Sequence, residues 1–335
     1  MNEKKSCLFN DRLRISITDA CNYKCFYCSN EGQEHGNCNM LSLDYIRQLF
    51  SRIRNEKIFV KKLNITGGEP TLHPDLLDIL REGRTISENV TLNTNGSLLN
   101  REIIDAIKNA GVNCIKFGTD LWFSDKSKPI TNVYEIDMDK LIDCILYSKE
   151  IMPRSSINIV ITDFNVFFFD KMLDWIEANN IDKVEFIELI NFDFEDKEFV
   201  KPLSDNAPDF PALIKNHRDR FSRIEYNPAI AKYVAYMKNG LAVQFAEDFC
   251  KRKVCANLWT RIDADGYFSP CMKNTDVYPI DMTMPLYDQF LAQRKFSCGA
   301  FDDVFPRDMN GKMVAGWTSK SKEEIVPSII TDTDL

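Results

Sequence analysis

Short runs of apolar and β-branched residues alternate with longer amphipathic stretches between residues 12 and 190. The short runs are typical of buried strands, and the longer stretches, with apolar residues three or four positions apart, are typical of helices that cover a sheet. The predicted strands are Leu13 to Thr18, Lys62 to Thr66, Asn89 to Asn93, Cys114 to Gly118, Ile157 to Ile161 and Val184 to Leu189. The predicted helices are Leu43 to Asn55, Asp75 to Glu82, Asn100 to Ala110, Met138 to Ile151 and Val166 to Asn179.

This alternation predicts a parallel sheet that curves without closing, because six strands are too few for a full barrel. We therefore predict an α/β fold, a partial (βα)6 TIM-like barrel, with its functional loops at the carboxyl ends of the strands. The alternation stops near residue 190. The predicted organisation is a barrel over 1–190, a connecting region over 191–249 with a helical stretch from Ala229 to Met237, a cluster-binding hairpin over 250–275 and a C-terminal tail over 276–335.

The composition is that of a folded globular protein, with 44% hydrophobic and 27% charged residues among 335. The formal net charge of -8 argues against a sequence-independent grip on nucleic-acid phosphates or on an anionic membrane. No apolar run approaches the roughly 20 residues that span a bilayer, and the first residues lack the apolar core of a signal peptide. We expect a cytoplasmic protein that binds neither a membrane nor a nucleic-acid polymer.

Eleven cysteines are an odd number in a chain without an export signal, so a disulfide framework does not explain them. Six of them form two groups: Cys21, Cys25 and Cys28 near the start, and Cys250, Cys255 and Cys271 late in the chain. The first group, in ITDACNYKCFYCSN, directly follows the first predicted strand. A loop this short can direct three thiolates at one [4Fe-4S] cluster, which normally takes four. One iron is then left for an external amino and carboxylate group.

A zinc site is the alternative for this loop, although the paired C-x2-C elements of most zinc ribbons are absent. The spacing C-x3-C-x2-C after a first strand resembles the radical S-adenosylmethionine (radical SAM) superfamily. The resemblance implies that a reduced [4Fe-4S] cluster at Cys21, Cys25 and Cys28 passes an electron to bound SAM. SAM then releases methionine and a 5'-deoxyadenosyl radical that abstracts a substrate hydrogen. The resemblance also implies a SAM contact from Tyr27.

The segment LNITGGEPTLHP after the second predicted strand is a second mark of this family. Two glycines remove side chains where the backbone approaches a ligand, and Glu69 offers a carboxylate to a cation. The resemblance assigns Gly67, Gly68 and Glu69 to the SAM amino group. The segment NTNG at the end of the third strand resembles one that lies near SAM and implies contacts from Thr94 and Asn95, although an Asn-Gly turn needs no ligand.

Two further SAM contacts follow from the same resemblance. Near relatives carry a serine close to the SAM ribose at the end of the fourth strand, where this chain has Gly118, and we expect that contact at Thr119 or Asp120 instead. The segment SINIVITDFN resembles the fifth strand of the family and the asparagine after it, which implies a role for Asn165. The predicted SAM site thus extends around the barrel.

The late cysteines lie in DFCKRKVCANLWTRIDADGYFSPC, where the DADG turn predicts a hairpin that brings distant thiols together. A second C-x2-C pair is absent, and we predict a second, auxiliary Fe-S cluster, a [4Fe-4S] cluster, at Cys250, Cys255 and Cys271. Cys298 is the rival fourth ligand. With Cys298 the cluster is closed and serves electron transfer or support, whereas without it one iron can bind a substrate atom.

Over roughly residues 10 to 275 these features resemble the GTP 3',8-cyclase branch of the superfamily, the molybdenum-cofactor enzymes. In that branch an arginine matched by Arg14 contacts the substrate nucleotide, and Arg261 lies near late arginines that do the same. The chain departs from the branch in the wider spacing of Cys250 and Cys255, Trp259 in place of an arginine, Ser-Asn after Cys28, and an end, TDTDL, without the catalytic Gly-Gly tail. We therefore expect an enzyme other than that cyclase.

The resemblance predicts a radical SAM enzyme that acts on a small metabolite, with a nucleotide as the first choice. The same architecture also serves ribosomal-peptide modification, by epimerisation or crosslinking, and carbohydrate dehydrogenation or deoxygenation. A rival of another class is an iron-sulfur electron-transfer or metal-binding protein without SAM turnover. The GGEP segment with Glu69 argues against this rival. Because open-site clusters are damaged by oxygen, we expect a reducing compartment and a flavodoxin or ferredoxin-type electron donor.

Overall fold

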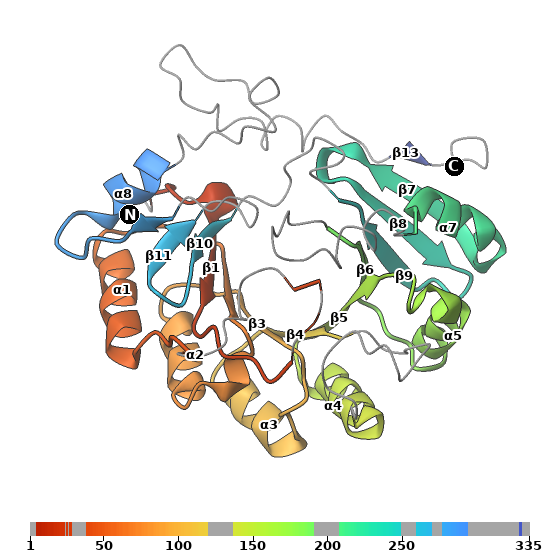
Figure 1. Ribbon diagram of the computed structural model, residues 1–335, viewed down its shortest axis with the longest axis horizontal. Helices are drawn as coiled ribbons and strands as arrows, with labels where there is room; N and C mark the ends of the chain where they lie inside the picture. The colour runs from red at the N-terminus through yellow and green to blue at the C-terminus, as the bar shows by residue number, and fades with distance from the viewer. Residues whose placement is uncertain are drawn as a thin grey trace, which may run out of the picture.

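The computed structural model describes residues 5–23, 25, 27–28, 38–119, 137–190, 208–248, 259–269, 277–293 and 328–329. Strands and helices alternate as β1 (Arg12–Ser16), α1 (Leu43–Asn55), β2 (Lys62–Thr66), α2 (Leu76–Arg84), β3 (Val90–Thr94), α3 (Arg101–Asn109), β4 (Cys114–Gly118), α4 (Met138–Ile151), β5 (Arg154–Ile161), α5 (Phe169–Ala178) and β6 (Val184–Glu188). The six strands are parallel, lie in chain order and curve into an open arc with the helices outside it (Figure 1). Each strand and helix predicted for the barrel is thus confirmed, with ends shifted by a few residues at most.

Alternate residues of these strands face opposite sides of the sheet. The outer side is apolar: Ile15 and Ile65 are completely buried and pack in one core with Leu49 of α1. The inner side carries polar residues, among them the register partners Arg14 and Asn64. The arc therefore has an apolar outer layer under the helices and a polar interior.

Local chemistry sets the ends of the helices. The Ser42 hydroxyl accepts a hydrogen bond from the N–H of Tyr45 at 3.2 Å at the start of α1, and Oδ1 of Asn100 accepts one from the N–H of Ile103 at 2.8 Å at the start of α3. Gly111, with φ of 88°, follows the end of α3 in the left-handed conformation that glycine favours. None of the described helices is long and apolar enough to cross a membrane.

The sheet continues beyond the six predicted strands at both edges. At one edge β10 (Thr260–Ile262) pairs in parallel with β1, followed by the antiparallel strands β11 (Tyr267–Ser269) and β12 (Tyr278–Pro279). At the other edge β9 (Ala242–Ala246) pairs in parallel with β6, followed by the antiparallel strands β8 (Lys232–Met237), β7 (Phe221–Asn227) and β13 (Ser328–Ile329). The predicted hairpin around DADG is present as β10 and β11.

The predicted helical stretch from Ala229 to Met237 is wrong. Most of it is β8, in which every second residue is buried. This period of two, with tyrosine and valine in the run, favours a strand. With α7 (Phe210–Asn216), β8 and its neighbours enclose aromatic side chains, and the ring of Phe245 lies 5.4 Å from that of Phe210. Residues 208–248 therefore extend the sheet and its core.

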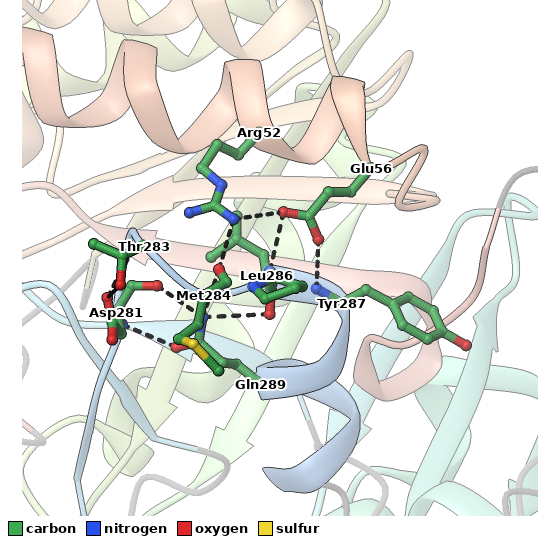
Figure 2. A network of polar contacts seen from close by, with 9 residues as sticks. Arg52, Glu56, Asp281, Thr283, Met284, Leu286, Tyr287 and Gln289 are labelled. Atoms are coloured by element: carbon green, nitrogen blue, oxygen red, sulfur yellow. Dashed lines mark hydrogen bonds and ion pairs between the residues drawn. The ribbon is translucent and has the colours of Figure 1, made fainter.

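The segment after β12 is fastened to the outside of the barrel through Glu56, which follows α1 (Figure 2). Its carboxylate accepts hydrogen bonds from the first two N–H groups of α8 (Leu286–Gln293), at 3.0 and 2.8 Å. Arg52 pairs with Glu56 at 3.0 Å and donates to the carbonyl oxygen of Met284 at 2.5 Å. Burial acts to raise the pKa of Glu56, but these donors outweigh it, and the pKa lies below its usual value. The edge that carries the DADG hairpin is thereby anchored to the first βα unit.

Candidate functional site

The loop after β1 carries Cys21, Cys25 and Cys28 at the carboxyl end of the sheet. All three thiols are half-buried and free of disulfide bonds. The N–H of Cys28 donates to the carbonyl oxygen of Cys25 at 3.1 Å, which turns the loop back on itself. Burial raises the pKa of Tyr23, and the charges of Cys25 and Cys21 contribute to the rise. These thiols and the phenol therefore share one electrostatic environment.

Two glycines after β2 allow the chain to lie directly against the cysteine loop. A Cβ at Gly67 would be 2.4 Å from the carbonyl oxygen of Thr18, and one at Gly68 would be 2.2 Å from that of Ala20. The N–H groups of Gly68 and Glu69 donate to the same two oxygens at 2.7 Å each. The close approach that these glycines permit is therefore to the backbone of the cysteine loop, and it fixes Glu69 beside that loop.

Glu69 is completely buried and lies at the centre of a network between the ends of β2 and β3. Its Oε1 accepts hydrogen bonds from the N–H of Thr71 at 3.0 Å, the hydroxyl of Thr71 at 2.5 Å and the hydroxyl of Thr94 at 2.7 Å. Its Oε2 accepts one from the N–H of Asn95 at 2.7 Å. Burial raises the pKa of Glu69, whereas the four donors favour the carboxylate. The network holds this carboxyl group in one position.

Asn95 joins the end of β3 to the cysteine loop. Its Nδ2 donates to Oδ1 of Asn22 at 2.9 Å, and its Oδ1 accepts from the N–H and hydroxyl of Ser97 at 2.9 and 2.7 Å. Nδ2 of Asn22 donates in turn to the Ser97 hydroxyl at 2.9 Å. The three side chains form a closed ring that restrains the loop between Cys21 and Cys25. Sequence reasoning missed Asn22 and Ser97.

Thr94 and Asn165 lie at the ends of β3 and β5 with polar groups that the protein already uses. The Thr94 hydroxyl, besides its bond to the buried carboxylate, accepts from the N–H of Gly96 at 3.0 Å. Asn165 is completely buried; its Oδ1 accepts from the N–H of Thr162 at 2.9 Å and its Nδ2 donates to the carbonyl oxygen of Val160 at 2.8 Å. These bonds shape the loops, and a SAM contact from either side chain stays a prediction.

Arg14 of β1 and Arg261 of β10 are register partners and lie side by side on the inner face of the sheet. Nη2 of Arg14 donates to the hydroxyl of Thr66 at 3.2 Å. Burial lowers the pKa of Arg14 to about 10, and the negative charge of Cys28 acts in the opposite direction. The structure thus brings together the two residues predicted to bind substrate, one of them close to the cysteine loop.

Trp259 occupies the amino-terminal end of this inner face. Its ring centre lies 5.2 Å from the guanidinium of Arg12 and 5.7 Å from Nζ of Lys62. Burial lowers the pKa of Lys62 to about 8, and the nearby charges of Lys116 and Arg12 add to the effect. An aromatic ring therefore faces two cations at the place where an arginine is expected from the resemblance.

Comparison with known proteins decides the family. The model of the radical SAM superfamily matches residues 15–176. A probable GTP 3',8-cyclase of Methanosarcina mazei is 31% identical over 266 residues, which cover 78% of this chain and 77% of that protein. The chain belongs to the radical SAM superfamily. A second radical SAM relative, a probable GTP 3',8-cyclase of Metallosphaera sedula, is 29% identical over 79% of this chain and 81% of its own.

Solved structures of radical SAM proteins share the fold. Native anSMEcpe with bound AdoMet has a TM-score of 0.59 at 15% identity and covers 93% of this chain and 95% of its own. Streptococcus suis SuiB bound to precursor peptide SuiA has a TM-score of 0.59 at 14% identity and covers 89% of this chain and 67% of its own. These likenesses confirm the predicted open, partial barrel.

The radical SAM family implies a [4Fe-4S] cluster and SAM, and the residues present fit both groups. Three thiols in one loop, none of them in a disulfide bond, can each bind a different iron of a cubane. Among the described residues, no group of three or more Cys, His, Asp or Glu side chains has the geometry of a site for a single metal ion, whose ligands lie closer together than those of a cubane. Oε2 of Glu69, with one hydrogen bond from Asn95, offers an acceptor position to an ammonium group.

Some predicted site residues are not placed by the structure. Asp120, Cys250, Cys255, Cys271 and the rival ligand Cys298 lie outside the described residues. Tyr27 is half-buried in the cysteine loop. The auxiliary cluster and the SAM contacts of Tyr27 and Asp120 therefore stay predictions.

Sequence reasoning also missed four polar residues of the inner face: Asn64, Thr91, Asn93 and Asn158. Each has a buried side-chain oxygen without a hydrogen-bond partner among the residues that the structure describes. One signal was present in the sequence, because strands of a parallel sheet that is buried on both faces read as nearly continuous apolar runs. A polar residue inside such a strand therefore marks a position where the interior is not filled by apolar side chains.

Proposed function

We propose that this radical SAM enzyme cleaves SAM reductively and abstracts a hydrogen atom from a small polar metabolite, with a nucleotide as the first candidate. The observation that carries the proposal is the placement of the cysteine loop, with its three thiols, next to the buried carboxyl group of Glu69 at the carboxyl ends of β1 and β2. When bound, the cluster and SAM supply the electron and the 5'-deoxyadenosyl radical.

The residues of the site have distinct roles in this proposal. Cys21, Cys25 and Cys28 hold three irons as thiolates. Glu69 binds the SAM ammonium group as a carboxylate, in a position fixed by its hydrogen bonds. Asn95 holds both Glu69, through its N–H, and the cysteine loop, through its side chain. Cluster and cofactor are thereby tied to one rigid frame.

A nucleotide is favoured by Arg14 and Arg261, register partners on neighbouring strands, since guanidinium groups bind phosphate by paired hydrogen bonds. The names of the curated relatives, probable GTP 3',8-cyclases, support the same class. Trp259 in place of an arginine distinguishes this chain from that branch. A ribosomal peptide and a carbohydrate are the alternative substrates. Screening of candidate substrates distinguishes them from a nucleotide.

The proposal includes a second [4Fe-4S] cluster at Cys250, Cys255 and Cys271, and a flavodoxin or ferredoxin-type donor in the cytoplasm. The DADG hairpin supports it, because the hairpin lies between the second and third of these cysteines and pairs with β1. Anaerobic reconstitution followed by iron analysis tests it. About eight irons per chain support two clusters, and about four exclude the second.

Reductive SAM cleavage is tested by anaerobic reconstitution, reduction with dithionite and chromatography of 5'-deoxyadenosine. We expect 5'-deoxyadenosine from the wild-type protein and none above background from a variant with Cys21, Cys25 and Cys28 changed to alanine. The matched control is Cys38→Ala, which removes an exposed thiol outside this trio. Absence of 5'-deoxyadenosine from the wild-type protein with a full cluster content would instead identify an electron-transfer or metal-binding protein.

A further inference from the structure

Within the described part of the chain, four side chains on the inner face of the barrel carry buried polar atoms without a hydrogen-bond partner. They are Asn64 of β2, Thr91 and Asn93 of β3, and Asn158 of β5, through Oδ1 of each asparagine and Oγ1 of the threonine. Asn64 and Thr91 are only 4% and 1% exposed. Burying a polar atom without a partner costs free energy, and folded proteins pair the large majority of such atoms. The cluster therefore indicates a partner that the described part of the chain does not supply.

The four residues form one surface. Asn64 and Thr91 are register partners in neighbouring strands, and Asn93 is two residues further along β3 on the same side. Asn158 is the register partner of Gly118 on β4. A Cβ at Gly118 would have a single neighbouring atom within 4 Å, at 3.9 Å, so there is space beside Asn158.

Side-chain contacts join β4, β5 and β6 on the same face, and strand register links β3 to them. Sγ of Cys114, the register partner of Thr91, lies 3.8 Å from Oγ of Ser156, two residues before Asn158. Nζ of Lys116 pairs with Oε2 of Glu185 at 3.6 Å across this face. Asn158 is the register partner of Glu185 and lies beside this ion pair, to which Lys232 also belongs. At the other end of the surface, Asn64 lies beside Arg14 of β1.

We propose that Asn64, Thr91, Asn93 and Asn158 bind a hydroxyl-rich group of the substrate, such as a sugar. The unpaired asparagine atoms are amide oxygens, which only accept hydrogen bonds, and the threonine hydroxyl can donate or accept. An alcohol can donate to these oxygens and also accept from the hydroxyl, whereas an ionised carboxylate only accepts and an apolar group does neither. The anionic part of the same substrate belongs at Arg14, which is the register partner of Asn64. This inference rests on the proposed function and names its substrate class, a phosphorylated sugar, free or as part of a nucleotide.

Calorimetric titration of the reconstituted protein without dithionite tests the inference, because no turnover takes place. Two pairs of probes are compared: GTP with 2',3'-dideoxy-GTP, and ribose 5-phosphate with 2-deoxyribose 5-phosphate. Members of a pair carry the same charge and differ in hydroxyl groups. We expect the hydroxylated member of one pair to bind about tenfold more tightly, or more, since lost hydrogen bonds in a buried site cost about this factor. The discriminating pair shows whether the sugar belongs to a nucleotide.

Variants assign the effect to residues. Thr91→Val and Asn64→Leu remove the unpaired atoms at similar volume, and we expect each to remove most of the discrimination. Ser148→Ala is the matched control, because Oγ of Ser148 is also buried and has no partner in the described ranges, but it belongs to α4 outside the arc. It should leave the ratio of affinities unchanged.

Equal affinity within both pairs, or binding of none of the four probes, overturns the inference. Discrimination that persists in both variants overturns the assignment to this surface. The comparison on the wild-type protein decides the substrate class even where a variant fails to fold. Since 5'-deoxyadenosine formation is measured separately, a protein that cleaves SAM but ignores the sugar hydroxyls contradicts this inference alone, and one that does not cleave SAM contradicts the proposed function.

Discussion

The carboxyl end of the barrel and its inner face differ in how their polar groups are paired. At the carboxyl end, the carboxylate of Glu69 accepts four hydrogen bonds, and the side-chain amide of Asn95 both donates and accepts. On the inner face, Asn64 and Thr91 have buried polar atoms for which the described residues offer no hydrogen-bond partner. Both regions are built by β2 and β3, so the difference in hydrogen bonding arises from the side chains and not from the backbone that carries them.

This contrast indicates two tasks. A paired network has its geometry before any ligand binds, which suits a cofactor that must be held in one position. Unpaired buried groups are costly until a ligand satisfies them, and a site of this kind rejects ligands that lack the matching hydroxyl or amide. We therefore infer that the carboxyl end of the barrel, the rim, holds the cofactor and that the inner face selects the substrate.

Replacing Glu69 removes the acceptor at the centre of the paired network and has the largest expected effect on stability and on SAM binding. In Glu69→Ala the donors of Thr71, Thr94 and Asn95 lose their acceptor, and we expect the free energy of unfolding to fall by about 3 kcal/mol. Loss of the charged acceptor should raise the Kd of SAM about 100-fold. Denaturant titration measures the first quantity, and equilibrium dialysis with labelled SAM under anaerobic conditions measures the second.

Glu69→Gln separates the two effects, since it keeps the shape and one acceptor oxygen but removes the charge. It should recover most of the stability and little of the SAM affinity. Glu82→Ala, which removes a partly exposed carboxylate on α2 that pairs with Arg47 at 3.4 Å, is a control expected to change stability by about 0.5 kcal/mol or less. Wild-type SAM affinity in Glu69→Gln would show that the carboxylate does not bind the cofactor.

Substitutions at two glycines test how closely the loop after β2 packs against the cysteine loop. In Gly68→Ala the new Cβ would lie 2.2 Å from the carbonyl oxygen of Ala20, so the cysteine loop must move. We expect a loss of about 2 kcal/mol or more in the free energy of unfolding and a lower iron content after reconstitution. Gly118→Ala, where the nearest atom would be 3.9 Å away, should change stability by about 0.5 kcal/mol or less. Equal losses in the two variants would contradict a tight contact between the two loops.

The barrel could be predicted from the sequence because its strands are apolar runs and its helices carry apolar stripes. Leu43 to Asn55, for instance, follows the capping residue Ser42 and buries Ile46, Leu49, Phe50 and Ile53 on one side. The strand Lys232–Met237 escaped prediction because its conformation depends on pairing with β7 and β9 and not on local signals alone.

Parts of the candidate site that depend on local sequence could likewise be predicted, and parts that depend on tertiary contacts could not. The cysteine spacing and the GGE segment are local and could be read directly. The ring of Asn22, Asn95 and Ser97 could not, because Asn22 and Ser97 are 75 positions apart and meet only when β1 and β3 are in place. The unpaired atoms of Asn64 and Thr91 depend on strand register, which single-sequence patterns do not specify.

The smallest effect concerns Lys62, at the amino-terminal end of the inner face. Burial lowers its pKa from 10.5 to about 8, so the folded protein releases this proton at a lower pH than the unfolded chain does. Between these two values the unfolded state binds more protons, and the contribution of Lys62 to the free energy of unfolding rises with pH. Below pH 8 the lysine is charged in both states, and the cost of burial is fully present.

Because the side chain is partly exposed, we expect a rise of about 1 to 2 kcal/mol, less than the full shift implies. Lys62→Met should lack this rise and should be more stable than the wild-type protein near neutral pH by about the same amount, because methionine has no charge to bury. Denaturant titrations at several pH values between about 7 and 10 compare the two proteins, with Lys108→Met, an exposed site on α3, as the control. A rise of equal size in Lys62→Met would assign the titration to another group. The contrast with the carboxyl end of the barrel would then rest on the uncharged atoms of Asn64 and Thr91 and not on Lys62.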